Sequence, residues 1–255
     1  MKTIRSIEEL RRELDARTGL IGLVPTMGAL HRGHEALIGT ARAQNDVVVV
    51  SLFVNPAQFD EGADLAAYPR DEEGDAARAA AAGGDILFAP GPDEVYPPGF
   101  QTWVEVEELS RVLEGVHRPG HFRSVATVCL KLFNIARPDR AYFGQKDAQQ
   151  VAVIRRLVRD LNLEIEIRSV PTVRDADGLA LSSRNARLSP AEREAALALP
   201  RALATRDLAA ARSALDGLQV DYVEMADFDP PVLAAAVRVG STRLIDNVVL
   251  EEEPA

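Results

Sequence analysis

The sequence predicts an α/β fold, a doubly wound parallel sheet followed by a smaller C-terminal α+β domain. Apolar segments rich in β-branched residues, without polar alternation, occur at residues 20–24 and 47–53, which is typical of strands buried on both faces. Segments with helical spacing separate such strands, and this alternation indicates a parallel sheet covered by helices. Near residue 175 the pattern changes, because "RDADGLALSS" carries an Asp-Gly turn signal between extended segments. We therefore predict two domains, residues 1–175 and 176–255.

The elements of the first domain follow one another in a regular order. The N-terminal segment "MKTIRSIEELRREL" is charged and has helical spacing. Three further strands are predicted after the first two, at residues 85–90, 140–144 and 164–170. Helices are predicted between the strands, at residues 34–44, 72–84, 124–137 and 147–163.

The second domain begins with a strong helix signal. In the segment 188–203, Ser189 is a suitable N-cap, Pro190 takes the first helical position and Glu192 completes a capping box. Two helices and two strands, residues 219–227 and 242–250, are expected to complete this domain.

Composition limits the classes of protein to be considered. The chain of 255 residues is 47% hydrophobic, and its net charge is −10, which argues against a nucleic-acid binder but allows a small anionic ligand in a local basic pocket. Cys129 is the only cysteine and lies in an apolar helical segment, so we expect a buried core thiol and a reducing compartment. The N-terminus lacks the apolar core of a signal peptide, and no apolar run approaches the ~20 residues that span a bilayer. These features predict a cytoplasmic protein without a membrane partner.

Two of the four histidines, His31 and His34, lie in "PTMGALHRGH", directly after the first strand. Ligands of open parallel sheets bind at the carboxyl ends of the strands, and a helix N-terminus there favours phosphate. Gly33 would allow close approach of the backbone, and the two imidazoles would add side-chain donors. The alternative is that the histidines only cap a helix. A metal site is less well supported, because no third ligand follows at suitable spacing, and the P-loop pattern is absent.

Other polar residues follow later strands or lie in a loop. Asn55 and Gln58 stand in "FVNPAQF", either as substrate ligands or as turn residues, and "YFGQKDAQQ" places Lys146 and Asp147 at the start of a helix, with Gln150 one turn later. The loop segment "LSSRN" (181–185) combines hydroxyl, guanidinium and amide groups suited to a polyphosphate. Together these segments predict a nucleotide pocket.

These motifs also carry a resemblance. "PTMGALHRGH", "FVNPAQF", "RPGHF", "YFGQKDAQQ", "PTVRDADGLALSSRN" and "TRLIDN" resemble, in the same order, the motif series of the pantothenate synthetase family (pantoate–β-alanine ligases). "HRGH" also resembles the HxGH signature of the nucleotidyltransferase superfamily, which includes class I aminoacyl-tRNA synthetases. The resemblance implies a Rossmann-like domain of the HxGH type and a C-terminal lid domain.

The implied activity is the ATP-dependent ligation of pantoate and β-alanine to pantothenate through a pantoyl-adenylate, with release of AMP and pyrophosphate. His34 matches the catalytic proton donor, and His31 and Lys146 match residues that handle the phosphates. Gln58 and Gln150 match the residues that bind pantoate, and Asn55 is expected to bind substrate with them. No protein metal ligand is expected, because Mg²⁺ would arrive on the ATP phosphates. A homodimer is expected by the same resemblance. The implied ATP-binding residues are Met27, Gly28, Ala29, Leu30, His31, Arg32, Gly33, His34, Gly144, Gln145, Lys146, Asp147, Val173, Leu181, Ser182, Ser183 and Arg184.

The chain departs from the family pattern at a few positions. Leu181 stands where the family commonly has Met, Gln145 where it has Glu, and Ser124 where it usually has Gly. The C-terminal domain also looks shorter than usual, which is expected to affect closure and substrate affinity more than chemistry. His117 and His121 are expected to shape the neighbouring loop, and Asp75 is a weak candidate for an Mg²⁺ ligand.

Two other functions remain open at this point. One is a different HxGH-type adenylyltransferase, although "FVNPAQF" and "KDAQQ" favour a pocket for an acyl substrate. The other is a degenerate, non-catalytic ATP-binding homologue. The first predicts a stable adenylylated product, and the second predicts nucleotide binding without pyrophosphate exchange.

Overall fold

The computed structural model describes residues 1–59, 65–66 and 68–250. The chain divides into two compact units, the first formed by Met1–Phe143 and Val153–Val170, and the second by Gly144–Ala152 and Pro171–Ala255. The segment that directly follows the predicted strand at residues 140–144 therefore belongs to the second unit. Among the described residues, no helix has the length and the apolar character needed to cross a membrane.

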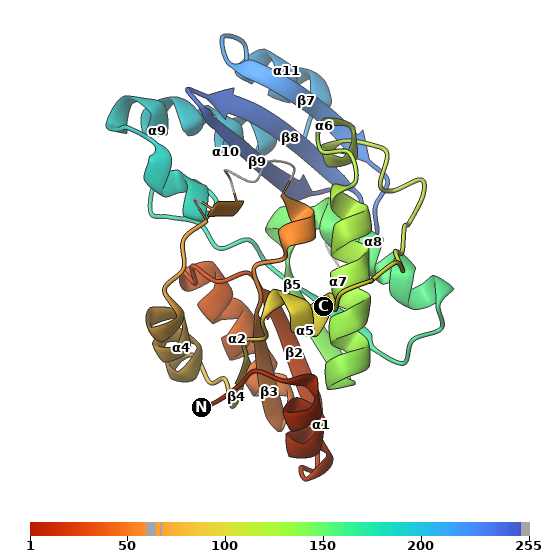
Figure 1. Ribbon diagram of the computed structural model, residues 1–255. Coiled ribbons are helices and arrows are strands. Elements are labelled where there is room, and N and C mark those ends of the chain that lie inside the picture. The colour runs from red at the N-terminus through yellow and green to blue at the C-terminus, as the bar shows by residue number, and fades with distance from the viewer. Residues whose placement is uncertain (60–64, 67, 251–255) are drawn as a thin grey trace. The chain divides into compact units, whose positions relative to one another are not determined.

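A six-stranded parallel sheet forms the centre of the first unit (Figure 1). The strand order is β1-β4-β3-β2-β5-β6, so the chain runs outward from β2 to β4 and then returns to the other side of β2. The reversal lies between β2 and β5, and this confirms the predicted doubly wound fold. The strands are β1 (Lys2–Ile4), β2 (Ile21–Thr26), β3 (Val47–Leu52), β4 (Ile86–Phe88), β5 (Arg140–Gly144) and β6 (Glu166–Val170).

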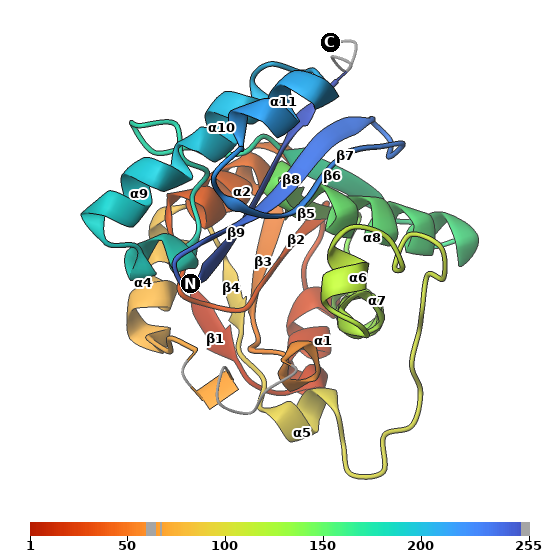
Figure 2. The same cartoon turned by 90° about the horizontal axis from the view of Figure 1, so that it is seen from above.

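Helices cover both faces of this sheet. Figures 1 and 2 show α2 and α4 on one face and α1 and α7 on the other. The layer under α2 is a continuous hydrophobic core in which Ile38 packs with Val24 and Val50. The helices are α1 (Ile7–Asp15), α2 (Arg32–Gln44), α4 (Glu72–Ala81), α5 (Pro92–Val95), α6 (Glu114–His117), α7 (His121–Ala136) and α8 (Ala148–Asp160), of which α8 crosses from the second unit into the first.

The N-terminal segment differs from the prediction. Residues Lys2–Ile4 form β1, paired in parallel with β4, and the helix begins only at Ile7. Ser6 caps this helix by accepting a hydrogen bond from the Glu9 N–H. Three residues are too few to show the alternation of side chains that is typical of a strand. The segment is extended because it pairs with a strand more than eighty residues later.

The second unit contains a three-stranded antiparallel sheet, β7 (Gln219–Ala226), β8 (Val232–Val239) and β9 (Thr242–Val249), in that order. Three helices accompany it, α9 (Pro190–Ala196), α10 (Ala198–Leu203) and α11 (Leu208–Ala214). The two predicted strands, residues 219–227 and 242–250, are confirmed as β7 and β9, but the expected number of strands was wrong, because β8 lies between them. Strand β8 was missed because its sequence, "VLAAAVRV", is rich in alanine, which is a weak strand former. Pairing on both sides and a hydrophobic core under the helices make it the central strand.

Two local predictions are confirmed. Ser189 and Glu192 form the capping box of α9, with Pro190 at the first helical position. Cys129 is buried in α7, and burial raises the pKa of its thiol to about 12.

Candidate functional site

The two histidines of "HRGH" stand at the start of α2, just beyond the carboxyl end of β2. His31 is the N-cap, and its Nδ1 accepts a hydrogen bond from the Gly33 N–H at 3.1 Å. The His34 Nδ1 in turn accepts from the His31 N–H at 3.3 Å, and the ring centroids lie 4.2 Å apart. Because both Nδ1 atoms accept, each neutral ring carries its proton on Nε2. The arrangement caps the helix and turns both imidazoles into Nε2–H donors.

Gly33 makes this arrangement sterically feasible. A Cβ atom at position 33 would lie 2.9 Å from Cε1 and 3.0 Å from Nδ1 of His31. Any other residue at this position would displace the His31 ring from its capping position. The glycine between the histidines is therefore explained by local packing.

The loop before the histidines is held by a buried carboxylate. Oδ2 of Asp75 accepts from the Ala29 N–H at 2.9 Å, and Oδ1 accepts from the Leu30 N–H at 2.7 Å. Asp75 is only 4% exposed and lies in the first turn of α4. Gly28 and Ala29 both have positive φ, 89° and 51°, and this backbone aims two successive N–H groups at one anion.

A second polar turn, η1 (Pro56–Gln58), follows β3. Asn55 is its N-cap and accepts from the Ala57 N–H, while its Nδ2 donates to Oε1 of Gln58 at 3.0 Å. Asn55 is 1% exposed. In this structure its amide orients the Gln58 side chain.

The N-terminal part of α7 and the residues just before it fasten this turn. The Ser124 hydroxyl donates to the Ala57 carbonyl at 2.6 Å, and Arg118 contacts both the Gln58 carbonyl, at 3.4 Å, and Nε2 of His121, at 3.1 Å. His121 thus takes part in shaping the loop, as expected, and the serine at position 124 supplies a hydrogen bond to the turn that a glycine could not.

In the second unit, η2 (Gln145–Asp147) follows β5. Asn247 of β9 donates from Nδ2 to the carbonyls of Gln145 and Lys146, both at 2.9 Å, and accepts at Oδ1 from the Gln145 side chain. Nζ of Lys146 lies 3.5 Å from the Asp147 carboxylate. Gln145 is therefore part of a neutral amide pair with Asn247, which holds the turn that carries the lysine.

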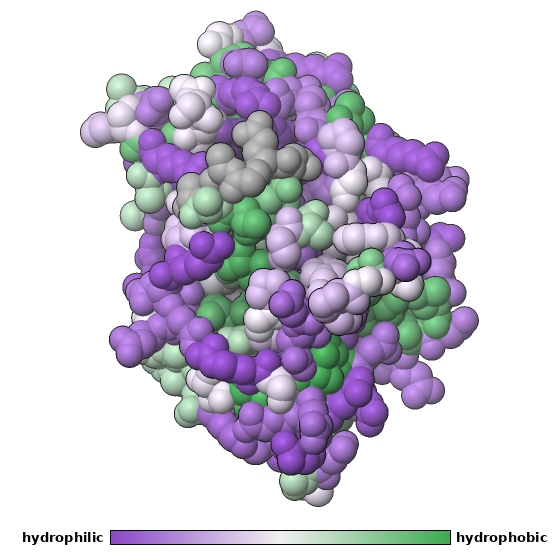
Figure 3. All heavy atoms as spheres, in the orientation of Figure 1, coloured by the Kyte–Doolittle hydropathy of each residue, from purple (hydrophilic) through white to green (hydrophobic). Residues whose placement is uncertain are grey.

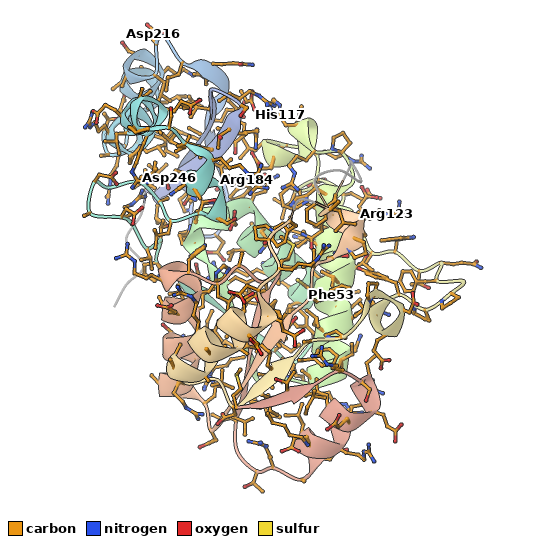
Figure 4. The ribbon with its side chains drawn as sticks, turned by 60° about the vertical axis from the view of Figure 1, so that its left-hand side comes forward. Phe53, His117, Arg123, Arg184, Asp216 and Asp246 are labelled. Carbon is orange, nitrogen blue, oxygen red and sulfur yellow. The ribbon has the colours of Figure 1, made fainter. Side chains whose placement is uncertain are left out.

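A partly buried ion pair supports the next segment. Arg174 donates to both oxygens of Asp246, at 2.6 and 3.1 Å, and to the Gly178 carbonyl. The side chain of Asp246 is 1% exposed and also accepts from the Asn247 N–H. Figure 4 labels Asp246 on the antiparallel sheet of this unit. The pair therefore supports the antiparallel bridge between Arg174 and Ala180, which precedes the "LSSRN" segment.

The "LSSRN" segment forms η3 (Ser183–Arg187), with Ser182 as N-cap accepting from the Arg184 N–H. The Leu181 N–H donates to the Val173 carbonyl, which ties together two of the predicted ATP-contacting positions. Figure 4 also labels Arg184 on this segment.

The predicted residues thus fall into two groups. The first unit holds Met27–His34, Asn55 and Gln58, and the second holds Gly144–Asp147, Gln150, Val173 and Leu181–Arg184. Sequence analysis missed the contacts of Asn247 and the loop-holding contacts of Asp75. The motif "TRLIDN" pointed to the first, whereas nothing in the local sequence connects Asp75 with residues 29 and 30. Within the described ranges, no three His, Cys, Asp or Glu side chains are grouped to hold a metal ion.

Figure 3 shows a face of the protein on which hydrophilic residues predominate. The net charge is −10, and Lys146 and Arg184 are two basic residues among the predicted ATP-contacting positions.

Comparison with known proteins gives a consistent picture. A family model described as pantoate-beta-alanine ligase matches residues 1–249. The pantothenate synthetase of Moorella thermoacetica is 52% identical over 280 aligned residues, which cover 98% of this chain and 99% of that protein. Pantothenate synthetase 1 of Bradyrhizobium diazoefficiens is 51% identical, with 100% of both chains covered. These alignments are longer than the 255 residues of the chain, so the relatives carry residues that have no counterpart here.

Solved structures agree with the sequence relatives. The crystal structure of pantothenate synthetase from Thermus thermophilus superposes with a TM-score of 0.93 at 46% identity, over 99% of this chain and 100% of that one. A pantoate-beta-alanine ligase from Francisella tularensis, crystallised with beta-gamma ATP and beta-alanine, gives a TM-score of 0.86 at 36% identity, with both chains fully covered.

Proposed function

This chain belongs to the pantoate–beta-alanine ligase family, and from that membership we propose that it joins pantoate to β-alanine at the expense of ATP. The products are pantothenate, AMP and pyrophosphate. The histidine pair at the start of α2 carries this proposal, because it presents two Nε2–H donors beside a helix N-terminus. Such a group of donors suits the oxygens of a phosphate chain.

The first proposed step forms a pantoyl-adenylate. An oxygen of the pantoate carboxylate forms a bond to the α-phosphorus of ATP, and the bond from that phosphorus to pyrophosphate breaks. A carboxylate with a reference pKa of about 4 is already ionised at pH 7, so this step needs no base. It needs alignment of the reactants and stabilisation of charge on the phosphoryl oxygens. In this role His34 donates from Nε2 to a phosphoryl oxygen, and His31 donates to the phosphate chain.

The second proposed step consumes the adenylate. The neutral amine of β-alanine attacks the acyl carbon, the carbon–nitrogen bond forms, and AMP leaves with the electrons of the carbon–oxygen bond. One proton is released from the nitrogen. Gln58 holds pantoate and approaches β-alanine, and Gln150 supplies a second amide for pantoate. The contacts that Asn55 makes to Gln58 support a positioning role for Asn55 in this pocket.

The remaining contacts to ATP are assigned to the second unit. Lys146 neutralises phosphate charge, with Ser182, Ser183 and Arg184 as further donors. We assign Mg²⁺ to the ATP itself, as part of the substrate MgATP, because its preferred ligands are phosphate oxygens and waters.

The test of this function is pantoate-dependent exchange of labelled pyrophosphate into ATP, measured without β-alanine. Exchange is expected, because adenylate formation is reversible while the second substrate is absent. Addition of β-alanine should then divert the intermediate to pantothenate and AMP. Folded protein that binds ATP without exchange would refute the proposal in favour of a degenerate ATP-binding homologue. A stable adenylylated product would favour a different adenylyltransferase of the same superfamily.

A variant of His34 isolates the proposed chemistry. His34→Ala should abolish exchange, because it removes the proton donor, while the fold survives. The variant loses one capping hydrogen bond, which is worth about 1 kcal/mol. Thermal unfolding is therefore the control, and loss of exchange together with loss of folding would leave His34 a structural residue.

We further propose a cytoplasmic homodimer in which residues 176–255 act as a shortened lid domain. The single buried cysteine supports a reducing compartment. Light scattering tests the dimer, and fractionation of the source cells tests the location. A lid role predicts that the exchange rate responds to solvent viscosity, because closure would then limit turnover.

A further inference from the structure

We propose that Asp75 is a positioning residue that holds the loop Met27–Leu30 in the conformation needed for ATP binding. This inference rests on the proposed function, because it concerns the same nucleotide site. It assigns to Asp75 a role toward the backbone of the chain in place of a role as a metal ligand.

The contacts of the Asp75 carboxylate carry the inference. Each of its two oxygens accepts one backbone N–H, from Ala29 at 2.9 Å and from Leu30 at 2.7 Å. Hydrogen bonds to an ionised acceptor are the stronger class, and burial at 4% exposure protects them from competition by water. Two short bonds to consecutive residues fix both the position and the direction of the loop.

The loop needs such a partner because its backbone is unfavourable. Ala29 has φ of 51°, a left-handed conformation that costs free energy for any residue with a Cβ atom. Gly28 has φ of 89°. Without the carboxylate, two buried N–H groups would lack partners, and the chain would relax toward ordinary φ values.

The location of the loop connects this contact to catalysis. Leu30 directly precedes His31, whose ring caps α2, so a shift of the loop moves the N-cap residue. The N–H groups of Ala29 and Leu30 form a concavity of the kind that binds anions, but the protein supplies its own anion there. Phosphate binding therefore depends on the imidazoles and the helix N-terminus, which the loop holds in place.

The test uses Asp75→Asn with a matched control, Asp85→Asn. Asp85 also accepts a backbone N–H, from Val48 at 2.8 Å, and it pairs with Arg42. It precedes β4, at the amino ends of the strands, so it lies at the edge of the sheet opposite the loop. Both substitutions replace a carboxylate by an amide of the same shape. Only Asp75→Asn should affect ATP.

The first readout is amide hydrogen exchange by NMR in the protein without substrates. Protection at Ala29 and Leu30 should fall in Asp75→Asn by about tenfold or more, the equivalent of one hydrogen bond. The control should lose protection at Val48 and keep it at the loop. This readout needs no activity, so it tests the positioning role even if the wild-type protein lacks pyrophosphate exchange and the proposed function fails.

The second readout is the KM for each substrate in pyrophosphate exchange. Asp75→Asn should raise the KM for ATP by about tenfold, with the KM for pantoate changed less than about twofold. Equal losses in the control and in Asp75→Asn, or unchanged loop protection, would overturn the inference. A selective rise in the Mg²⁺ concentration required for activity would also overturn it, in favour of a metal ligand.

A second variant guards against a failure of Asp75→Asn to fold. A Cβ atom on Gly28 would lie 2.9 Å from Oδ2 of Asp75, and Gly28 has positive φ. Gly28→Ala therefore disturbs the same contact from the loop side. It should reproduce the loss of protection at Ala29 and Leu30 and the rise in the KM for ATP, and retention of both wild-type values would contradict the inference.

Discussion

Replacement of Gly33 by alanine should separate stability from activity in this protein. The added Cβ would lie 2.9 Å from Cε1 and 3.0 Å from Nδ1 of His31, and these atoms belong to a ring that can rotate away. Rotation breaks the hydrogen bond from the Gly33 N–H to Nδ1, which spans 3.1 Å. The substitution therefore removes the cap and displaces the imidazole.

The two effects on stability oppose each other. Loss of an N-cap bond costs about 1 kcal/mol, while alanine in a helix is favoured over glycine by about 1 kcal/mol. The net change in the free energy of unfolding should be close to zero, and Tm should stay within about 4 °C of the wild type. Activity has no such compensation, because His31 is proposed to contact the reacting phosphates, and a displacement of such a group by about 1 Å costs roughly 100-fold in rate.

The assay is pantoate-dependent pyrophosphate exchange, followed in parallel with thermal unfolding. Gly39→Ala is the matched control, because it lies in the same helix and a Cβ there would meet nothing within 4 Å. The control should gain up to about 1 kcal/mol in stability and keep the wild-type exchange rate. A wild-type rate for Gly33→Ala would refute the role of the His31 ring, and a large loss of stability would refute the compensation.

Three further outcomes are expected. Ser124→Ala removes the hydrogen bond to the Ala57 carbonyl, so the free energy of unfolding should fall by about 1 kcal/mol. The KM for pantoate should rise, while the KM for ATP stays constant. An unchanged KM for pantoate would show that this hydrogen bond does not affect substrate binding. Arg174→Met leaves the Asp246 carboxylate, 1% exposed, without its cation, which should cost roughly 3 kcal/mol in urea denaturation. Addition of Asp246→Asn should recover part of this loss, and no recovery would contradict the explanation by unpaired charge. Burial raises the pKa of the Cys129 thiol from 9.0 to about 12, so between these values the unfolded chain loses a proton that the folded chain keeps, and stability should fall as pH rises. A flatter alkaline slope in Cys129→Ala would confirm that contribution, and an unchanged slope would exclude it.

Much of the fold and both groups of candidate residues could be predicted from local patterns. Predominantly apolar segments such as 47–53 predict strands buried on both faces. The capping signal at Ser189 depends on residues three positions apart. The histidines of "HRGH" and the lysine of "GQKD" follow strands directly, so the rule that ligands bind at the carboxyl ends of parallel strands was enough to single them out. These features need only short stretches of chain, and for that reason the sequence alone carries them.

Other features depend on partners far along the chain. Strand β1 exists through its pairing with β4, and the alanine-rich β8 is a strand because β7 and β9 pair with it on both sides. Asp75 binds N–H groups 45 and 46 residues away, and its own neighbours give no sign of that contact. A hydrogen bond between distant residues is set by the whole packing of the chain, which no window of local sequence contains. The motifs thus pointed to the candidate residues, whereas the folded chain showed which other residues contact them.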